Sequence, residues 1–124
     1  MTSSGGAAVP RRGEIWSVLL PNQPEDIHKP RPGLIVSVDV RNRLAGDVTV
    51  VPLSTTLRPL ATHVMISAQV SGLRQNSMAK CEQVTTLDKR FLGTTPIGRR
   101  LPDSLLNDVV RAIRRAIGET LPTA

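Results

Sequence analysis

Hydrophobic and polar residues alternate along much of the chain with the two-residue period of β-strands. Residues 14–20, EIWSVLL, alternate in this way and are rich in side chains that favour strands. Residues 31–40, RPGLIVSVDV, form an apolar run that ends near Asp39, which is typical of a strand buried on both faces. Residues 48–56, VTVVPLSTT, predict a strand in which Pro52 marks an edge, a bulge or a strand end, because proline cannot donate a ladder hydrogen bond.

Two more strands are expected farther along the chain. Residues 62–68, THVMISA, predict a short strand, and residues 77–88, SMAKCEQVTTLD, predict a longer one. Residues 40–47 and 70–76 contain glycine, asparagine and other turn formers, so we interpret both as turns. Residues 89–100 are basic and irregular, with room for one short strand or helical turn.

Near the C-terminus the hydrophobic pattern changes to the period of a helix. Apolar side chains recur at helical spacing at Leu106, Val109, Val110, Ile113 and Ile117. Asp103 or Ser104 can cap the start of this helix, and Gly118 can end it. Short strands followed by one long helix predict a mainly β fold with a C-terminal helix, built as a small and strongly bent barrel.

The length of 124 residues is that of one domain. We expect a disordered tail at 1–10, a single domain at 11–119 and a flexible end at 120–124. The opening sequence MTSSGGAAVPRR lacks the apolar core of a signal peptide, and no apolar run approaches the ~18 residues of a membrane span. We therefore expect no membrane association.

Charge and composition narrow the choice of partner. The net charge is +6 and the pI is about 11.0, which favours a polyanion such as nucleic acid, although charge that only aids solubility is the alternative. The only aromatic residues are Trp16 and Phe91, so a bound nucleic acid would be held by charge, hydroxyls and amides rather than by stacking. Cys81 is the only cysteine, which excludes an intrachain disulfide and suits a reducing, cytoplasmic setting.

No metal or cofactor is expected from the sequence. The only histidines are His28 and His63, and neither stands at ligand spacing from the other or from Cys81. The ten acidic residues are scattered, and the chain has neither of the glycine-rich phosphate-binding signatures G-x-x-x-x-G-K and G-x-G-x-x-G.

The remaining polar residues suit cleavage of a phosphodiester without metal. The set is Arg31, His28, Ser54, Thr55, Thr56, Lys80, Glu82 and Gln83. Glu82 could act as base and Lys80 or His28 as acid, while the planar guanidinium of Arg31 could clamp phosphate. Proline on both sides of Arg31 restricts its backbone to an extended geometry at the mouth of a strand. The alternatives are a surface ion pair for Arg31 and an exposed strand pair for Lys80 and Glu82.

Four motifs, in order and at similar spacing, resemble the MazF/PemK family of bacterial toxin endoribonucleases. They are RGEIWSVL at 12–19, RPGLIVS at 31–37, VVPLST at 50–55 and SMAKCEQVTTLD at 77–88, and a C-terminal helix follows them. The resemblance covers the chain from about Arg12 to Ile117. It implies an SH3-like barrel (the PemK/CcdB fold) that works as a homodimer.

The resemblance also implies an activity. Members cleave single-stranded RNA at a short sequence without metal, through attack of the 2′-OH that leaves a 2′,3′-cyclic phosphate. The expected substrate is single-stranded RNA, with messenger RNA as the first candidate and transfer or ribosomal RNA as the others. A cognate antitoxin occupies the active groove and neutralises the toxin.

By the same resemblance, individual residues take roles. Arg31 would stabilise charge on the phosphate, and Ser54, which replaces a threonine of the family, would contact the scissile phosphate beside Thr55. Glu82, which replaces an aspartate, is the candidate base, and Lys80 the candidate acid. The expected RNA-binding residues are Asp26, His28, Thr56, Ser77 and Gln83, of which Gln83 has a structural role as its alternative.

Three further residues are assigned to packing. We interpret His63 as the partly buried start of a strand, Cys81 as a core residue on the face opposite Lys80 and Glu82, and Trp16 as barrel core or dimer surface.

Two other functions remain open. One is a non-enzymatic CcdB-like gyrase poison, against which the ending GETLPTA argues because it lacks that toxin's Trp-Gly-Ile tail; the other is a catalytically degenerate member that only binds RNA or an antitoxin.

Overall fold

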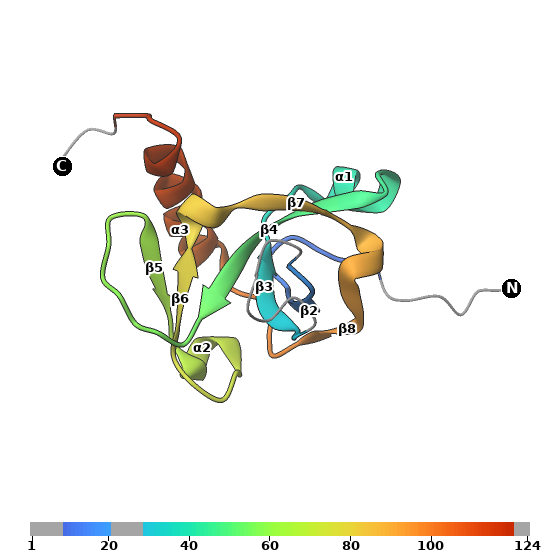
Figure 1. The fold of residues 1–124 in the computed structure, drawn as a ribbon, viewed down its shortest axis with the longest axis horizontal. Coiled ribbons are helices and arrows are strands. Elements are labelled where there is room, and N and C mark those ends of the chain that lie inside the picture. The colour runs from blue at the N-terminus through green and yellow to red at the C-terminus, as the bar shows by residue number, and fades with distance from the viewer. Residues whose placement is uncertain (1–8, 21–28, 121–124) are drawn as a thin grey trace, which may run out of the picture.

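The computed structural model describes residues 9–20 and 29–120 (Figure 1). The strands are β2 (Ile15–Val18), β3 (Arg31–Ile35), β4 (Asp47–Ser54), β5 (His63–Ile66), β6 (Ser77–Lys80), β7 (Thr85–Asp88) and β8 (Leu92–Ile97). The helices are α1 (Asp39–Leu44), α2 (Ala68–Ser71) and α3 (Asp103–Ala116), with 3-10 turns η1 (Cys81–Gln83) and η2 (Lys89–Phe91). The predicted tail at 1–10 and the end at 120–124 fall mostly outside the described residues.

The strands form one strongly bent antiparallel sheet. Its order is β5-β6-β4-β3-β2-β8, and β7 pairs with β4 beside this path. β4 is the hub, because it pairs with β3 along one edge and with β7 and then β6 along the other. The prediction of a mainly β fold with a C-terminal helix is confirmed, while the expected barrel is a bent sheet that does not close: β5 and β8, at the ends of this order, are not paired with each other (Figure 1).

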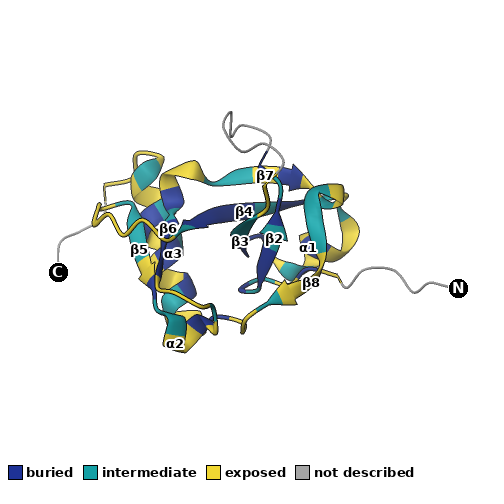
Figure 2. Ribbon diagram, turned by 60° about the horizontal axis from the view of Figure 1, so that its bottom comes forward, coloured by how far each residue is buried: buried dark blue, intermediate teal, exposed yellow. Residues whose placement is uncertain are grey.

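The sheet is buried on both faces. On one side Leu34 and Val51 pack with α3, and on the other Ile35 and Val50 pack around Trp16; all four aliphatic side chains are fully buried. Figure 2 shows this burial concentrated in the central strands, with exposed residues at the rim. The prediction of a strand buried on both faces is confirmed for β3, although this strand ends at Ile35 and not near Asp39. Trp16 belongs to the core.

The C-terminal helix ends as the sequence predicts but begins differently. Gly118 has a φ of 102°, its N–H donates to the Arg115 carbonyl, and the Glu119 N–H donates to the Arg114 carbonyl. This is the Schellman ending that glycine favours. The prediction of a side-chain cap was wrong, because Pro102 precedes the helix without a capping hydrogen bond and Asp103 lies in its first turn.

Other boundaries also differ from the prediction. Residues 40–47 are not simply a turn, since α1 begins at Asp39; the buried side chain of Asn42 donates to the Ser37 carbonyl at 2.9 Å and holds the helix against the sheet. The turn expected at 70–76 is partly taken up by α2. Within residues 89–100, η2 and then β8 form. None of the helices in the described part of the chain is long and apolar enough to cross a membrane.

Candidate active site

A bulge beside β4 carries part of the site. Ala79 of β6 lies opposite Leu53, and Thr85 of β7 lies opposite Val50, so residues 80–84 must fit opposite only residues 51 and 52. They leave the ladder with β4, and Cys81–Gln83 form η1. Such bulges redirect side chains to the surface. The prediction of one continuous strand over 77–88 was therefore wrong, as was the argument that Lys80 and Glu82 share a strand face.

Pro52 lies where this bulge leaves the sheet. It pairs with Gly33 on the β3 side, between the segment of β4 that meets β7 and the segment that meets β6. Because the bulge interrupts the ladder at this point, the missing N–H of proline leaves no broken hydrogen bond. Of the three alternatives predicted for Pro52, an edge, a bulge or a strand end, the structure shows the bulge, in the segment between β6 and β7 that lies opposite Pro52.

Arg31 stands at the start of β3, as predicted from its flanking prolines. It lies opposite Val18 of β2 and is half-buried. From there its side chain lines a cavity that it shares with the end of β4 and with the bulge. A guanidinium in this position supplies a planar, permanently charged donor group.

Ser54 is the last residue of β4, where the chain turns away from the sheet. Its Oγ accepts a hydrogen bond of 3.1 Å from the Thr56 N–H, so its own hydrogen is available for donation into the cavity. Thr55 and Thr56 follow directly and are exposed. The end of β4 thus places three hydroxyls beside Arg31.

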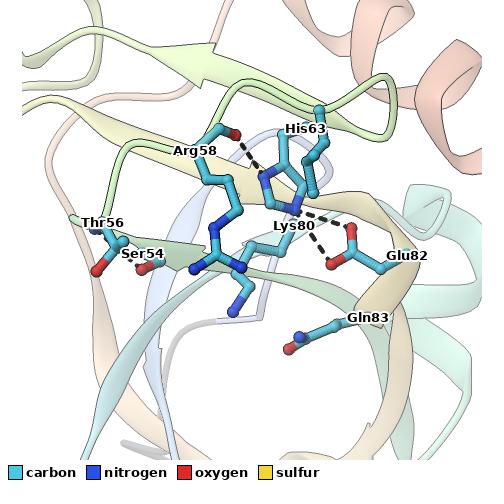
Figure 3. A pocket seen from close by; sticks show the side chains of 8 residues that line it. Ser54, Thr56, Arg58, His63, Lys80, Glu82 and Gln83 are labelled. Carbon is cyan, nitrogen blue, oxygen red and sulfur yellow. Dashed lines mark hydrogen bonds and ion pairs between the residues drawn. The ribbon is translucent and has the colours of Figure 1, made fainter.

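Two adjoining cavities form a groove across this end of the sheet. The larger, about 430 Å³, is named here the Arg31 cavity, and its polar lining includes Arg31, Ser54, Thr55, Thr56, Lys80 and Gln83. The smaller, about 280 Å³, is the His63–Glu82 cavity, lined by Ser54, Thr56, Arg58, Leu60, His63, Lys80, Glu82 and Gln83. They share Ser54, Thr56, Lys80 and Gln83, and Figure 3 shows these side chains around the smaller cavity.

The His63 ring contacts the Glu82 carboxylate at the edge of the smaller cavity (Figure 3). The ring Nε2 lies 3.1 Å from both carboxylate oxygens, and the Thr62 hydroxyl donates to Oε1 at 3.0 Å. On the other side of the ring, Nδ1 lies 2.8 Å from the Arg58 carbonyl oxygen. The His63 side chain is only 4% exposed, whereas that of Glu82 is 36% exposed, so the carboxylate is the member that meets solvent.

Glu82 is ionised at neutral pH. Burial raises the pKa of Glu82, but hydrogen bonds from His63, from its own backbone N–H and from Thr62 outweigh that effect and hold the pKa below its usual range. A carboxylate in this state accepts hydrogen bonds and is present in its proton-accepting form.

Cys81 takes no part in the groove. It is fully buried, and burial together with the neighbouring charge of Glu82 raises the pKa of its thiol to about 12. A thiol in this environment is inert, which confirms the prediction that Cys81 is a core residue. Within the described ranges, no three His, Cys, Asp or Glu side chains gather closely enough to hold a metal ion.

The structure brings together most of the residues selected from the sequence. Those that line the groove are Arg31, Ser54, Thr55, Thr56, Lys80, Glu82 and Gln83. Ser77 does not join them, because it is 2% exposed at the start of β6, opposite Ile66. Asp26 and His28 lie outside the described residues.

Two polar residues of the groove were missed. His63 was assigned to packing; its predicted place at the start of a strand and its burial are confirmed, but its ring also pairs with Glu82. Arg58 was not selected at all, and its side chain lines the smaller cavity. His63 could have been found only from the register of β5 and β6, because this register places His63 opposite Lys80 and so beside the groove.

The fold and the groove define a small β protein with a mostly cationic cleft suited to an anionic polymer. Residues 11–117 match the model of the PemK-like, MazF-like toxins of type II toxin-antitoxin systems, and the chain belongs to this family. It is 35% identical over 96 residues to Endoribonuclease MazF9 of Mycobacterium tuberculosis, covering 72% of this chain and 80% of that protein. It is 31% identical over 101 residues to Endoribonuclease PemK of Escherichia coli, and this match covers 80% of this chain and 75% of that protein.

Solved structures agree with this assignment. The toxin MazF-mt6 of Mycobacterium tuberculosis superposes with a TM-score of 0.73 at 33% identity, over 87% of this chain and 99% of that one. A mycobacterial endoribonuclease in complex with its cognate antitoxin superposes with a TM-score of 0.73 at 29% identity, over 91% of this chain and 99% of that chain. The suspected family resemblance is therefore confirmed.

Proposed function

We propose that this chain is a sequence-specific endoribonuclease toxin that cleaves single-stranded RNA without metal and leaves a 2′,3′-cyclic phosphate. The observation that supports this most strongly is the groove itself, in which Arg31 lines one cavity, Glu82 lines the other, and Ser54 and Lys80 line both. The relatives named above carry the designation endoribonuclease. The chain supplies cations, hydroxyls and a carboxylate in the groove, which are the groups this reaction requires.

In the proposed reaction the ribose 2′-oxygen attacks phosphorus, forming a P–O2′ bond and breaking the bond to the leaving 5′-oxygen. Glu82 orients the 2′-OH and accepts its proton, and Lys80 gives a proton to the 5′-oxygen. Arg31 and the hydroxyls of Ser54 and Thr55 stabilise the charge that builds on the phosphoryl oxygens. Thr56 and Gln83 contact the RNA on either side.

The proposal includes partners and setting. A cognate antitoxin would cover the groove, in keeping with the mycobacterial neighbour solved with its antitoxin. The toxin would act as a homodimer in the cytoplasm, where RNA is exposed to it. The net charge of +6 favours binding of RNA and of an acidic antitoxin segment alike.

The direct test is incubation of the purified protein with mixed single-stranded RNA in EDTA, followed by analysis of the fragment ends. We expect discrete fragments ending in a cyclic phosphate. No cleavage by protein that is folded and binds its antitoxin would refute the nuclease activity and favour a degenerate, binding-only member.

A further inference from the structure

His63 has a hydrogen-bond acceptor on each side of its ring. Nδ1 faces the Arg58 carbonyl oxygen at 2.8 Å, and Nε2 faces the Glu82 carboxylate at 3.1 Å. A neutral imidazole has one N–H donor, whereas the charged ring has two. Both contacts are hydrogen bonds only when both nitrogens carry hydrogen or when Glu82 itself is protonated.

Protonation of Glu82 conflicts with the surroundings of its carboxylate. Oε1 already accepts a hydrogen bond from Thr62, and the combined bonds hold the pKa of Glu82 below its usual range. The ion pair is therefore the form that satisfies every group. Other charged side chains near the ring are Arg58 and Lys80, which line the same cavity, and Arg115 of α3, which reaches the Ala61 carbonyl at 3.5 Å.

The same contacts exclude His63 as the group that exchanges a proton with RNA. Both ring nitrogens are engaged within the protein, and the side chain is only 4% exposed. A ring held in this way acts through the residue it touches. That residue is Glu82, whose carboxylate is the exposed member of the pair.

The His63 ring also lies between two segments that are distant in the sequence, the loop before β5 and the turn after β6. Residues 55–62, here the 55–62 loop, return into β5 through a bond from the His63 N–H to the Leu60 carbonyl at 3.0 Å. The Thr62 carbonyl accepts a bond of 3.0 Å from the N–H of Cys81, the first residue of η1. The ring therefore stands between the loop that carries Arg58 and the turn that carries Glu82.

We propose that His63 is a positioning residue that, in its doubly protonated form, fixes Glu82 as an oriented carboxylate in the groove and locks the 55–62 loop to η1. This inference rests on the proposed RNA cleavage for its catalytic consequence. The charged ring offsets the negative charge of Glu82, which would otherwise repel a phosphodiester in the same cavity. Glu82 can then lie beside the 2′-OH without expelling the phosphate.

The charge pair can be tested without RNA. The chain has two histidines, so nitrogen NMR of the ring resonances gives two sets of signals, and loss of one set in His63→Asn assigns them. We expect hydrogen on both His63 nitrogens at neutral pH, and a neutral ring in Glu82→Gln. A neutral His63 ring in the wild-type protein would overturn the proposal.

The catalytic consequence is tested with two matched variants. Asparagine places its amide near the position of Nδ1 and can keep the bond to the Arg58 carbonyl, whereas glutamine reaches the position of Nε2 and can keep the bond to Glu82. We expect His63→Asn to lower kcat on the order of 10²-fold with little change in KM, because a misplaced group costs about that much. His63→Gln should retain at least about ten times the kcat of His63→Asn.

The outcomes separate the two claims. Equal, wild-type kcat in both folded variants, with circular dichroism as the control for folding, would overturn the positioning role while leaving RNA cleavage intact. If the wild-type protein does not cleave RNA, the proposed function fails, and the NMR measurement still decides whether His63 and Glu82 form the charge pair.

Discussion

The two cavities of the groove are built in different ways. The Arg31 cavity is centred on the start of β3 and the end of β4, which are neighbours in the sheet and carry Arg31 and Ser54. Its lining is completed by Thr55, Thr56, Lys80 and Gln83. The His63–Glu82 cavity is formed by the 55–62 loop and the η1 bulge, whose key residues are 19 positions apart. The first cavity is built mainly on paired strands of the sheet, and the second is assembled mainly from a loop and a bulge at the edge of the sheet.

The geometry of the first cavity therefore depends on packing in the core, and that of the second depends on local hydrogen bonds. Behind the Arg31 cavity, the paired strands are held by fully buried side chains such as Leu34 and Val51. At the His63–Glu82 cavity, the geometry depends on a few hydrogen bonds among His63, Thr62 and Glu82. We therefore assign charge stabilisation to the first cavity and orientation of the nucleophile to the second.

The largest effect is expected from removing the cation of the Arg31 cavity. Arg31→Ala should lower the rate of RNA cleavage on the order of 10²–10³-fold, by analogy with loss of an oxyanion donor. Arg31→Lys is the matched control, because it keeps the charge but loses the planar fork of the guanidinium. Its cleavage rate should lie between those of the wild-type protein and Arg31→Ala. Single-turnover cleavage of a short RNA measures this, and full activity of Arg31→Ala would remove Arg31 from the site.

Salt should weaken RNA binding by the next largest amount. If Arg31, Arg58 and Lys80 each contact a phosphate, the slope of log affinity against log salt is about −2, which is roughly a 20-fold loss between 50 and 200 mM. Arg58→Ala should reduce the slope by about 0.7 and leave the His63 contact intact, because that contact uses the Arg58 backbone. A slope unchanged in this variant would exclude Arg58 from RNA binding.

Ser54, which both cavities share, should show a smaller effect. Ser54→Ala removes one hydroxyl and should slow cleavage roughly tenfold, equivalent to about 1.4 kcal/mol. Ser54→Thr keeps the hydroxyl and should retain activity. Equal slowing of both variants would mean that the side-chain volume at the end of β4, and not the hydroxyl, is what the reaction requires.

The smallest effect concerns the stability of the His63–Glu82 cavity. Because its pKa is lowered on folding, ionised Glu82 stabilises the protein above the ordinary value of 4.5, and this contribution is lost as the pH falls through the lower pKa of the folded state. Denaturant unfolding of the wild-type protein and Glu82→Gln should therefore differ at neutral pH and converge in acid. A difference that grows toward acid would contradict the lowered pKa.

Most of the fold was predictable, because alternation reports burial residue by residue. The pattern predicted β2, β3, β4, β5 and α3, and Gly118 predicted the end of α3. The pattern did not predict that residues 77–88 break into two strands, because that break results from pairing with β4, a strand distant in sequence. It also missed α1, which is held by contacts from elsewhere, such as the bond between the Arg12 N–H and Asp39.

The residues of the site also differ in whether local sequence signals or distant pairing determine their position. The position of Arg31 at the start of a strand was predictable because its two flanking prolines are a local signal, whereas the role of Ser54 was inferred from the resemblance of its motif to the family. The role of His63 was not predictable, because its partner Glu82 meets it only through the pairing of β5 with β6 and the bulge that follows. Ser77 was selected by its motif, but its place on β6 turns its side chain into the core.

The proposed attack by the 2′-OH can be tested with a matched pair of RNAs. One is a short RNA that the protein cleaves, and the other is the same RNA with a single 2′-deoxynucleotide at the cleaved position. The account predicts that both bind with similar affinity in EDTA and that only the first is cut, leaving a cyclic phosphate. Cleavage of the deoxy-substituted RNA at the same bond would contradict it.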